Sequence, residues 1–262
     1  MKKYLAGVAM AALMGASVSA ADLKSDIDAD YDYLEKLYIH LHQNPELSLQ
    51  EEKSSKRMAM ELKKAGFEVT SNFGGYGVVA VMKNGDGPTV MIRADMDGLP
   101  VPEQTGLEYA SKATTKNEAG ETVPVMHACG HDVHMTSLIG TARRLAAMKS
   151  EWSGTLVMIA QPAEEQVKGA VAMLEEGLFT KFPKPDYNLA LHVSPDIKAG
   201  DIGMVSGYAL ANVDSADIEI HGIGGHGAYP HTTKDLWCWV LISSPHCKPL
   251  WRAKHHRSNP VL

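Results

Sequence analysis

Short apolar runs of strand length alternate along the chain with segments of helical periodicity, and this pattern constrains the fold more than any other feature. Gly77–Met82, Thr89–Ile92 and Thr155–Ala160 are rich in β-branched residues and favour strands. Apolar residues that recur with the spacing of one helix face indicate helices around these runs. Helices that alternate with apolar strands are typical of an α/β architecture. We expect helices at 34–41, Glu51–Ala65, Met135–Met148 and Gly169–Glu176, and a further short strand at Leu189–Val193.

Composition narrows the class of protein further. The 262 residues are 45% hydrophobic, which is enough for one large domain or two small ones with a packed core. The 25 Lys and Arg residues are outnumbered by 31 Asp and Glu residues, so the chain lacks the basic character that nucleic-acid binding requires. Three cysteines are too few for a disulfide scaffold.

The N-terminus has the pattern of a secretory signal peptide. Two lysines after Met1 precede an apolar run from Leu5 to Val18, and small residues lead to a cleavage point after Ala20. A membrane anchor is the alternative, but the run is shorter than the roughly 20 apolar residues that span a bilayer. We therefore expect residues 1–20 to be removed and the mature protein to be periplasmic or secreted, with no membrane partner.

The densest group of polar side chains lies in the segment Met126–His134. It contains Cys129, His131 and two further histidines, and thiolate and imidazole are ligands that zinc and neighbouring first-row metals prefer. In an extended segment, Cys129 and His131 project to the same side and can reach one metal pair. A single histidine in a loop is more often a hydrogen-bonded surface residue, but this combination favours a metal site.

Two adjacent carboxylates, Glu164 and Glu165, follow the expected strand Thr155–Ala160, at the position where α/β proteins carry their active sites. Adjacent side chains point in different directions, so one carboxylate can bind a metal while the other accepts a proton from water. The alternative is a solvated pair at the start of a helix, where the helix dipole favours acidic residues.

Three more polar groups have ordinary explanations when they are taken alone. His192 lies at the end of an apolar strand, where a single histidine is more often structural than a ligand. Asp97 and its neighbours follow the strand Thr89–Ile92, again at a strand end. His226 lies in the glycine-flanked segment Gly224–His231, which is also compatible with a plain turn.

Taken together and in this order, the polar groups resemble the M20 family of metallo-amidohydrolases and peptidases, in particular the branch that contains hippurate hydrolase and the auxin–amino-acid conjugate hydrolases. The resemblance extends from about Asp30 to Asp235 and is highly specific because its motifs follow in a fixed order. The motifs are His42–Ser48 with Glu51, Arg93–Pro100, Met126–His134, Gln161–Glu165, Leu191–Val193 and Gly224–His231.

The resemblance implies a dinuclear-metal aminopeptidase-like catalytic domain with an inserted α+β lid or dimerisation domain, and a homodimer for the full-length family member. Glu164 would be the general base that takes a proton from the attacking water. Asp97 would orient a ligand, and His226 would reach the active site of another subunit and stabilise the oxyanion. The implied metal ligands are Cys129, His131, Glu165 and His192.

The implied cofactors are two divalent metal ions, Mn²⁺ or Zn²⁺, with Co²⁺ or Ni²⁺ also compatible. Ligation by the Cys129 thiolate argues against a pure oxygen site for Mg²⁺ or Ca²⁺. The implied reaction is hydrolysis of the amide bond of an N-acyl or N-aroyl amino acid. A dipeptidase or carboxypeptidase of the same family is one alternative, and a non-catalytic binding protein is another. A structural zinc site is disfavoured because its ligands normally form a closed set of four, without an additional carboxylate base beside them.

The sequence changes character after Asp235. Residues 236–262 contain two of the three cysteines, three of the four tryptophans, four Lys or Arg residues and no Asp or Glu. Codons can be chosen that encode residues 236–262 and that, once one base is restored before codon 236, read in the shifted frame as an amphipathic helix. This helix looks like the continuation of the family sequence. We therefore interpret 236–262 as an out-of-frame tail, and a Cys238–Cys247 disulfide is the alternative.

These features define the expected domain organisation. Residues 21–205 would form the N-terminal part of the catalytic domain, 206–235 the start of the lid, and 236–262 the out-of-frame tail. Family members continue with the rest of the lid and a further histidine ligand. We therefore expect little or no activity from this chain, together with exposed apolar surface and unpaired strand edges.

Overall fold

The computed structural model of the protein describes residues 20–207, 219, 221–226 and 228–234. These residues belong to two compact units that are divided between Asp196 and Ile197, and each unit is described by itself. Residues 1–19 of the expected signal peptide and the expected tail at 236–262 lie outside the described residues. Within the described part, no helix combines the length and the apolar character needed to cross a bilayer.

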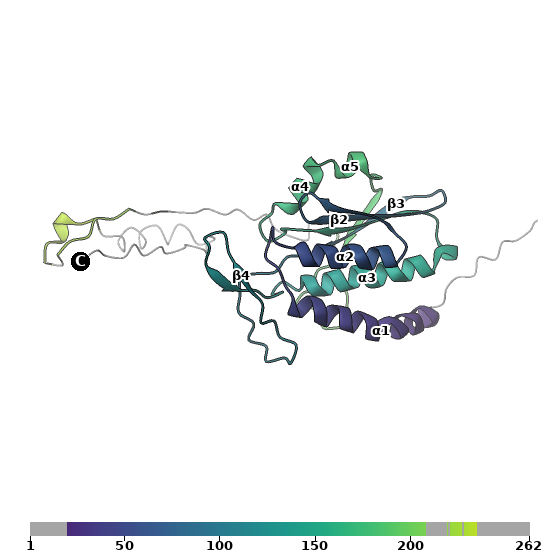
Figure 1. The fold of residues 1–262 in the computed structure, drawn as a ribbon, viewed down its shortest axis with the longest axis horizontal. Coiled ribbons are helices and arrows are strands. Elements are labelled where there is room, and N and C mark those ends of the chain that lie inside the picture. The colour runs from purple at the N-terminus through teal and green to yellow at the C-terminus, as the bar shows by residue number, and fades with distance from the viewer. Residues whose placement is uncertain (1–19, 208–218, 220, 227, 235–262) are drawn as a thin grey trace, which may run out of the picture. The chain divides into compact units, whose positions relative to one another are not determined.

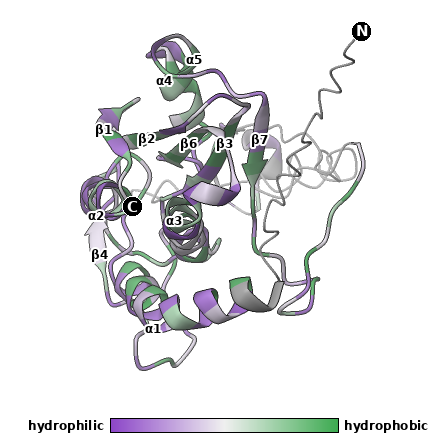
Figure 2. Cartoon of the chain, turned by 90° about the vertical axis from the view of Figure 1, so that its right-hand side faces the viewer, coloured by the Kyte–Doolittle hydropathy of each residue, from purple (hydrophilic) through white to green (hydrophobic). Residues whose placement is uncertain are grey.

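A five-stranded sheet forms the centre of the first unit (Figure 2). Its strands are β1 (Glu68–Phe73), β2 (Gly77–Asn84), β3 (Thr89–Asp95), β6 (Gly154–Gln161) and β7 (Tyr187–Ala190). They lie in the order β1-β2-β6-β3-β7, in which β1, β2 and β6 pair antiparallel while β6, β3 and β7 pair parallel. The last residues of β3 and β6 are register partners, so the carboxyl ends of these strands meet at one edge of the sheet.

Helices cover both faces of the sheet, which gives the first unit three layers (Figure 1). The longer helices α1 (Ala20–Gln43), α2 (Glu52–Lys64) and α3 (His131–Ala147) lie on one face. The short helices α4 (Gly169–Glu175) and α5 (Leu178–Lys181) lie on the other face.

The packing on both faces follows from the sequence of the central strands. In β2, Val78, Ala80 and Met82 pack with residues of α1, α2 and α3, whereas Val79 packs with residues of α4 and α5. A strand that is buried on both faces reads as a nearly continuous apolar run. Each large apolar side chain that is fully buried in this way stabilises the fold by about 1.5–3 kcal/mol.

Smaller elements of the first unit lie outside these layers. A hairpin of β4 (Thr114–Lys116) and β5 (Thr122–Pro124) belongs to the long connection between β3 and α3. A 3-10 turn at Lys149–Glu151 precedes β6. In the second unit, the described residues include a 3-10 turn at Pro230–Thr232 and an antiparallel bridge between Ile223 and Lys234. The expected lid at 206–235 stays a prediction, because residues 208–218 lie outside the described part.

The expected α/β class is confirmed, and the expected helices and strands are present with shifted ends. α1 is much longer than the predicted segment 34–41, and α3 begins at His131 rather than at Met135. The strand expected at Leu189–Val193 is displaced: β7 ends at Ala190, so His192 lies in an irregular segment beyond the strand.

Candidate metal centre

The residues predicted to bind metal come together beyond the carboxyl ends of the parallel strands. Asp97 follows β3, Glu164 follows β6 and His192 follows β7. His131 is the first residue of α3, and Cys129 lies in the turn before that helix. Because parallel strands end at the same edge of a sheet, segments that are far apart in sequence converge there.

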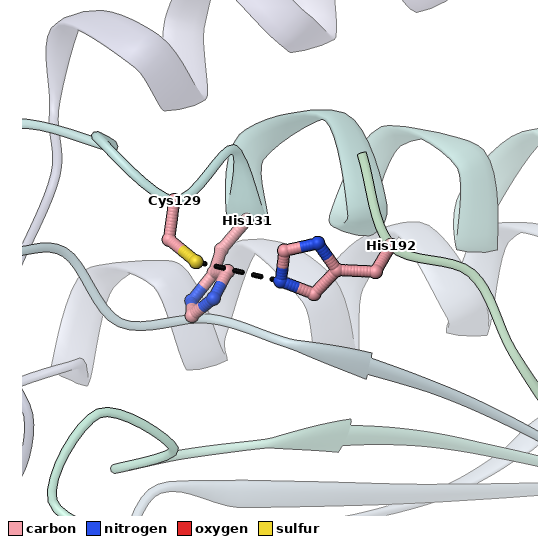
Figure 3. A group of neighbouring side chains, drawn as sticks. All are labelled: Cys129, His131 and His192. Atoms are coloured by element: carbon pink, nitrogen blue, oxygen red, sulfur yellow. Dashed lines mark hydrogen bonds between the residues drawn. The ribbon is translucent and has the colours of Figure 1, made fainter. Parts of the chain in front are cut away.

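Cys129, His131 and His192 point toward one another (Figure 3). The Sγ atom of Cys129 lies 3.4 Å from Nε2 of His192, and one ligand atom from each of the three residues lies within 4.8 Å of the others. The Nδ1–H group of His192 donates to the backbone carbonyl of Val193 at 2.7 Å. The ring nitrogen that remains, Nε2, therefore faces the thiol.

His131 also belongs to a second group of possible ligands. Its Nε2 atom lies 3.8 Å from Oε2 of Glu164 and 3.9 Å from Oε1 of Glu165. These distances are too long for hydrogen bonds. Both His131 Nε2 and Glu165 Oε1 are buried without a hydrogen-bond partner, although nearly all such atoms in folded proteins have one.

A divalent cation would satisfy these unpartnered atoms. Asp95, Asp97, Glu164 and Glu165 lie around His131, so the cluster gathers four carboxylates about one imidazole. The donor set of one thiol, imidazoles and carboxylates suits Zn²⁺, Mn²⁺ and their neighbours in the first transition row. The residues present therefore fit a divalent metal.

The expectation that Cys129 and His131 lie in an extended segment is wrong. Cys129 lies in a turn, and Gly130 adopts the left-handed conformation with φ +79° immediately before α3. A Cβ atom at Gly130 would lie 2.5 Å from Cγ2 of Val193, so only glycine allows this turn to pack so closely. The turn and the first residue of the helix, rather than strand alternation, bring the two side chains together.

The protonation of the cluster reflects its burial and its many carboxylates. Burial, together with the charges of Glu165 and Glu164, raises the pKa of the Cys129 thiol to about 12. The thiol therefore keeps its proton in the metal-free protein, and a metal must displace that proton to bind sulfur. Burial also raises the pKa of Glu165, although His131 acts against this effect.

Asp97 connects the segments that carry His131 and Glu165. Its Oδ1 atom lies 3.3 Å from Nδ1 of His131, and its Oδ2 atom accepts the backbone N–H of Glu165 at 3.0 Å. The hydroxyl of Ser48 donates to the same Oδ2 atom at 2.6 Å. Burial opposes ionisation of Asp97, but these hydrogen bonds outweigh it and hold the pKa of this carboxyl below its usual range.

The loop that carries the two glutamates is anchored by Glu51, the residue before α2. Ala163 has φ +45° and Val167 has φ +56°, conformations that residues other than glycine rarely adopt. The backbone N–H of Ala163 donates to Oε1 of the buried Glu51 at 2.6 Å. Glu51 belongs to a motif that is visible in the sequence, but the sequence alone does not indicate this role.

A third group, Asp95, His131 and His134, also has ligand atoms within 4.8 Å of one another. No role for Asp95 or His134 was predicted from the sequence, although a carboxylate at the end of β3 and a histidine one turn after His131 were visible signals. Burial opposes ionisation of Asp95, but His134, His131 and Arg93 outweigh it and hold the pKa of Asp95 at about 2.

His226 belongs to the second unit. Its exposed ring accepts the backbone N–H of Ala228 through Nδ1 at 3.1 Å, and it stacks at a tilt against Tyr229. The four predicted ligands and Glu164 all belong to the first unit. The contact of His226 with an active site stays a prediction.

Comparisons with known proteins identify the family. A family model described as Peptidase family M20/M25/M40 matches residues 91–244, more than half of the chain. Hippurate hydrolase from Campylobacter jejuni is 42% identical over 202 residues, which are 77% of this chain and 50% of that protein. The putative amidohydrolase YhaA from Bacillus subtilis is 36% identical over 251 residues, 95% of this chain and 59% of that protein.

A third relative, thermostable carboxypeptidase 2 from Saccharolobus solfataricus, is 38% identical over 81% of this chain and 52% of that protein. The chain spans about half the length of the curated relatives that it matches.

Two solved structures resemble the chain. The Bacillus subtilis YXEP protein, a dinuclear metal-binding peptidase from the M20 family, is 37% identical with a TM-score of 0.57, over 64% of this chain and 44% of that one. A putative aminohydrolase from methicillin-resistant Staphylococcus aureus is 30% identical with a TM-score of 0.62, over 86% and 59%. Because the family model matches residues 91–244 and these relatives are similar in sequence, the chain belongs to Peptidase family M20/M25/M40.

Proposed function

We propose that this chain carries the metal-binding part of an amidohydrolase site, which cleaves the amide bond of N-acyl or N-aroyl amino acids. The observation that carries the proposal is the position of His131. It belongs both to a thiol–imidazole group with Cys129 and His192 and to a carboxylate group with Glu164 and Glu165. Two adjacent ligand groups suit a pair of divalent ions, for which Mn²⁺ or Zn²⁺ are our first choices.

In this proposal the residues of the cluster divide the work. Bound ions would polarise the scissile carbonyl and lower the pKa of water. The Glu164 side chain is 38% exposed and that of Glu165 is 21% exposed, so Glu164 is the better placed to exchange protons with water and the leaving amine. Asp97 holds the backbone of Glu165 in place and lies beside His131. The ions would be held by Cys129, His131, Glu165 and His192.

The relatives support the substrate class and also supply its alternative. Similarity to hippurate hydrolase supports an N-acyl or N-aroyl amino acid as the substrate. Similarity to thermostable carboxypeptidase 2 supports a carboxypeptidase or dipeptidase instead. The two reactions break the same kind of amide bond, so the same cluster serves either.

The test uses the mass-verified 262-residue chain loaded with Mn²⁺ or Zn²⁺. Hydrolysis of N-benzoyl and N-acetyl amino acids is compared with hydrolysis of dipeptides, and binding of an N-acyl amino acid hydroxamate is measured in parallel because we expect low turnover. Glu164→Gln should lower hydrolysis about 10²–10⁴-fold and leave the metal content unchanged, since an amide takes up no proton.

Glu175→Gln is the matched control, because Glu175 is an exposed carboxylate at the end of α4. It should leave both hydrolysis and metal content unchanged. Equal hydrolysis by wild type and Glu164→Gln would contradict the proposal. The absence of both hydrolysis and metal-dependent hydroxamate binding would contradict it as well.

Two further parts of the proposal rest on sequence. We propose that the protein is exported, because Met1–Ala20 has the pattern of a signal peptide. We also propose that the full-length protein is a homodimer in which His226 reaches the neighbouring active site. Cell fractionation tests the first of these, and a product that keeps residues 1–20 in the cytoplasm would contradict it.

A further inference from the structure

The group Asp95, His131 and His134 looks at first like another place for a metal ion, because all three residues are buried and their ligand atoms lie close together. The hydrogen bonds of His134 exclude this interpretation. The backbone N–H of Val193 donates to Nε2 of His134 at 2.9 Å. A backbone amide only donates, so Nε2 carries the lone pair and Nδ1 carries the proton.

The protonated Nδ1 atom of His134 has its own partner. Oδ1 of Asp95 lies 2.6 Å from it and accepts its hydrogen bond, while Oδ2 of Asp95 faces the guanidinium of Arg93 at 2.7 Å. Both ring nitrogens of His134 are therefore engaged in hydrogen bonds. No lone pair of this imidazole is left for a metal.

The same hydrogen bonds lead from Asp95 to His192. The backbone N–H of Val193 donates to His134, and the carbonyl of Val193 accepts the Nδ1–H of His192 at 2.7 Å. This second bond fixes the tautomer of His192 and turns its Nε2 lone pair toward Cys129, 3.4 Å away. Metal-binding histidines characteristically donate their other ring N–H to a carbonyl or carboxylate in this way.

The segment around His192 depends on this connection. It lies beyond the end of β7, so no strand pairing holds it, and His192 itself is exposed. Val193 packs on the turn at Gly130, and the rings of His134 and His192 lie with their centroids 4.6 Å apart. The bond from Val193 to His134 thus attaches an otherwise irregular segment to α3.

We propose that Asp95 and His134 are positioning residues that hold His192 in the orientation and tautomer for metal binding, through the backbone of Val193, and that His134 is not itself a ligand. The inference rests on the proposed metal site. In this inference His134 acts only through His192, whereas a ligand would contact the metal directly.

The experiment is a double-mutant cycle with Co²⁺ as the probe, read from the visible and thiolate-to-cobalt absorption of the full chain. His134→Ala should weaken Co²⁺ binding about 10–100-fold, the usual effect of removing a residue that orients a ligand. His192→Ala should weaken it at least as much, and the double variant should bind as His192→Ala does. His40→Ala, which removes an exposed histidine in the last turn of α1, should bind as wild type does.

The possible results separate this inference from the proposed function. If the loss of Co²⁺ affinity in the double variant equals the product of the two single losses, His134 acts on the metal independently of His192. This result would overturn the inference. Failure of the wild-type chain to bind Co²⁺ would instead overturn the metal site itself. Circular dichroism of each variant checks that the fold is kept.

A second measurement reads the tautomer of His134 in the wild-type chain. In wild-type chain with ¹⁵N-labelled histidine, the nitrogen spectrum should show His134 protonated at Nδ1, and Zn²⁺ should shift the signals of His131 and His192 far more than that of His134. The His134 signals are assigned by their loss in His134→Gln. A proton on Nε2 of His134, or a Zn²⁺ shift as large as that of His192, would overturn the inference.

Discussion

At the scale of single residues, the segment His42–Glu51 supports the candidate site from outside it. Ser48 donates its hydroxyl to Asp97, and Glu51 accepts the backbone N–H of Ala163. Neither residue is among the groups of possible ligands in the described part of the chain. Their contribution is to fix the two segments that carry Asp97 and the glutamate pair.

Glu51 gives a prediction about pH. Its burial raises its pKa to about 7, against an ordinary value of 4.5. Between these values the folded state binds a proton that the unfolded state has released, so the free energy of unfolding falls as the pH rises from about 4.5 to 7. Glu51→Gln keeps the oxygen that accepts from Ala163 and removes the titration. Above pH 7, the free energy of unfolding of Glu51→Gln should exceed that of wild type by on the order of 3 kcal/mol, because each pKa unit corresponds to about 1.4 kcal/mol.

Urea unfolding of both proteins at pH 5 and pH 8 measures this difference. The control is Glu51→Ala, which also removes the charge but leaves the Ala163 N–H without its acceptor. It should be less stable than Glu51→Gln by about 1–3 kcal/mol at either pH. A gap between wild type and Glu51→Gln that is the same at both pH values would show that Glu51 titrates normally.

Sequence identified the residue types of the site but not their supporting partners. Cys129, His131 and Glu165 were recognisable because thiols, imidazoles and paired carboxylates are unusual in such density. Ser48 and Asp97 are 49 positions apart and Glu51 and Ala163 are 112 apart, and such pairs form only when the chain has folded. The hydrogen bond between His134 and Val193 could not be predicted for the same reason.

At the scale of elements, α2 is capped by a residue from the preceding turn. One carboxylate oxygen of Glu46, Oε2, accepts the backbone N–H groups of Lys53 and Ser54, each at 2.8 Å, and the Ser54 hydroxyl at 3.0 Å. These N–H groups lie in the first turn, where a helix has no acceptors of its own. A negative charge there is also favoured by the helix dipole.

Glu46→Ala should therefore lower the free energy of unfolding by about 1 kcal/mol, which is the usual cost of losing a helix cap. Urea denaturation with an unchanged m-value measures the loss. Glu52→Ala removes from the same turn an exposed carboxylate that pairs with Lys56, and its effect should stay within about 0.5 kcal/mol. Equal losses in the two variants would show that Glu46 acts by its charge alone.

Which elements could be predicted depended on their burial. β2, β3 and β6 lie inside the sheet and their apolar runs are evident in the sequence. β1 lies at an edge and five of its six residues are not buried, so Glu68–Phe73 reads as polar chain. The start of α3 was also missed, because His131 and Asp132 are buried polar residues that interrupt the apolar helical pattern.

At the scale of the whole molecule, the edge strand β7 leaves apolar side chains uncovered. Among the described strands, β7 pairs only with β3. Tyr187 is 64% exposed, Leu189 56% and Leu191 61%. An unpaired strand edge with exposed apolar side chains is a template for association between chains.

We therefore expect the 262-residue chain to self-associate, and Leu189→Lys to lower the associated fraction several-fold by placing a charge on that edge. Size-exclusion chromatography with light scattering measures the fraction. Leu174→Lys is the control, because Leu174 is 50% exposed but lies on helix α4. An equal decrease in both variants would mean that net charge, rather than the β7 edge, governs association.

The central claim is that the segments beyond β3, β6 and β7 and the start of α3 together bind divalent metal through His131. The most direct test is the Zn²⁺ content of the chain after equilibrium dialysis at a buffered free concentration, compared between wild type, His131→Ala and the exposed-site control His40→Ala. We predict that wild type and His40→Ala retain at least one ion per chain and that His131→Ala retains almost none. Wild type without bound Zn²⁺, or His131→Ala with as much as wild type, would contradict the account.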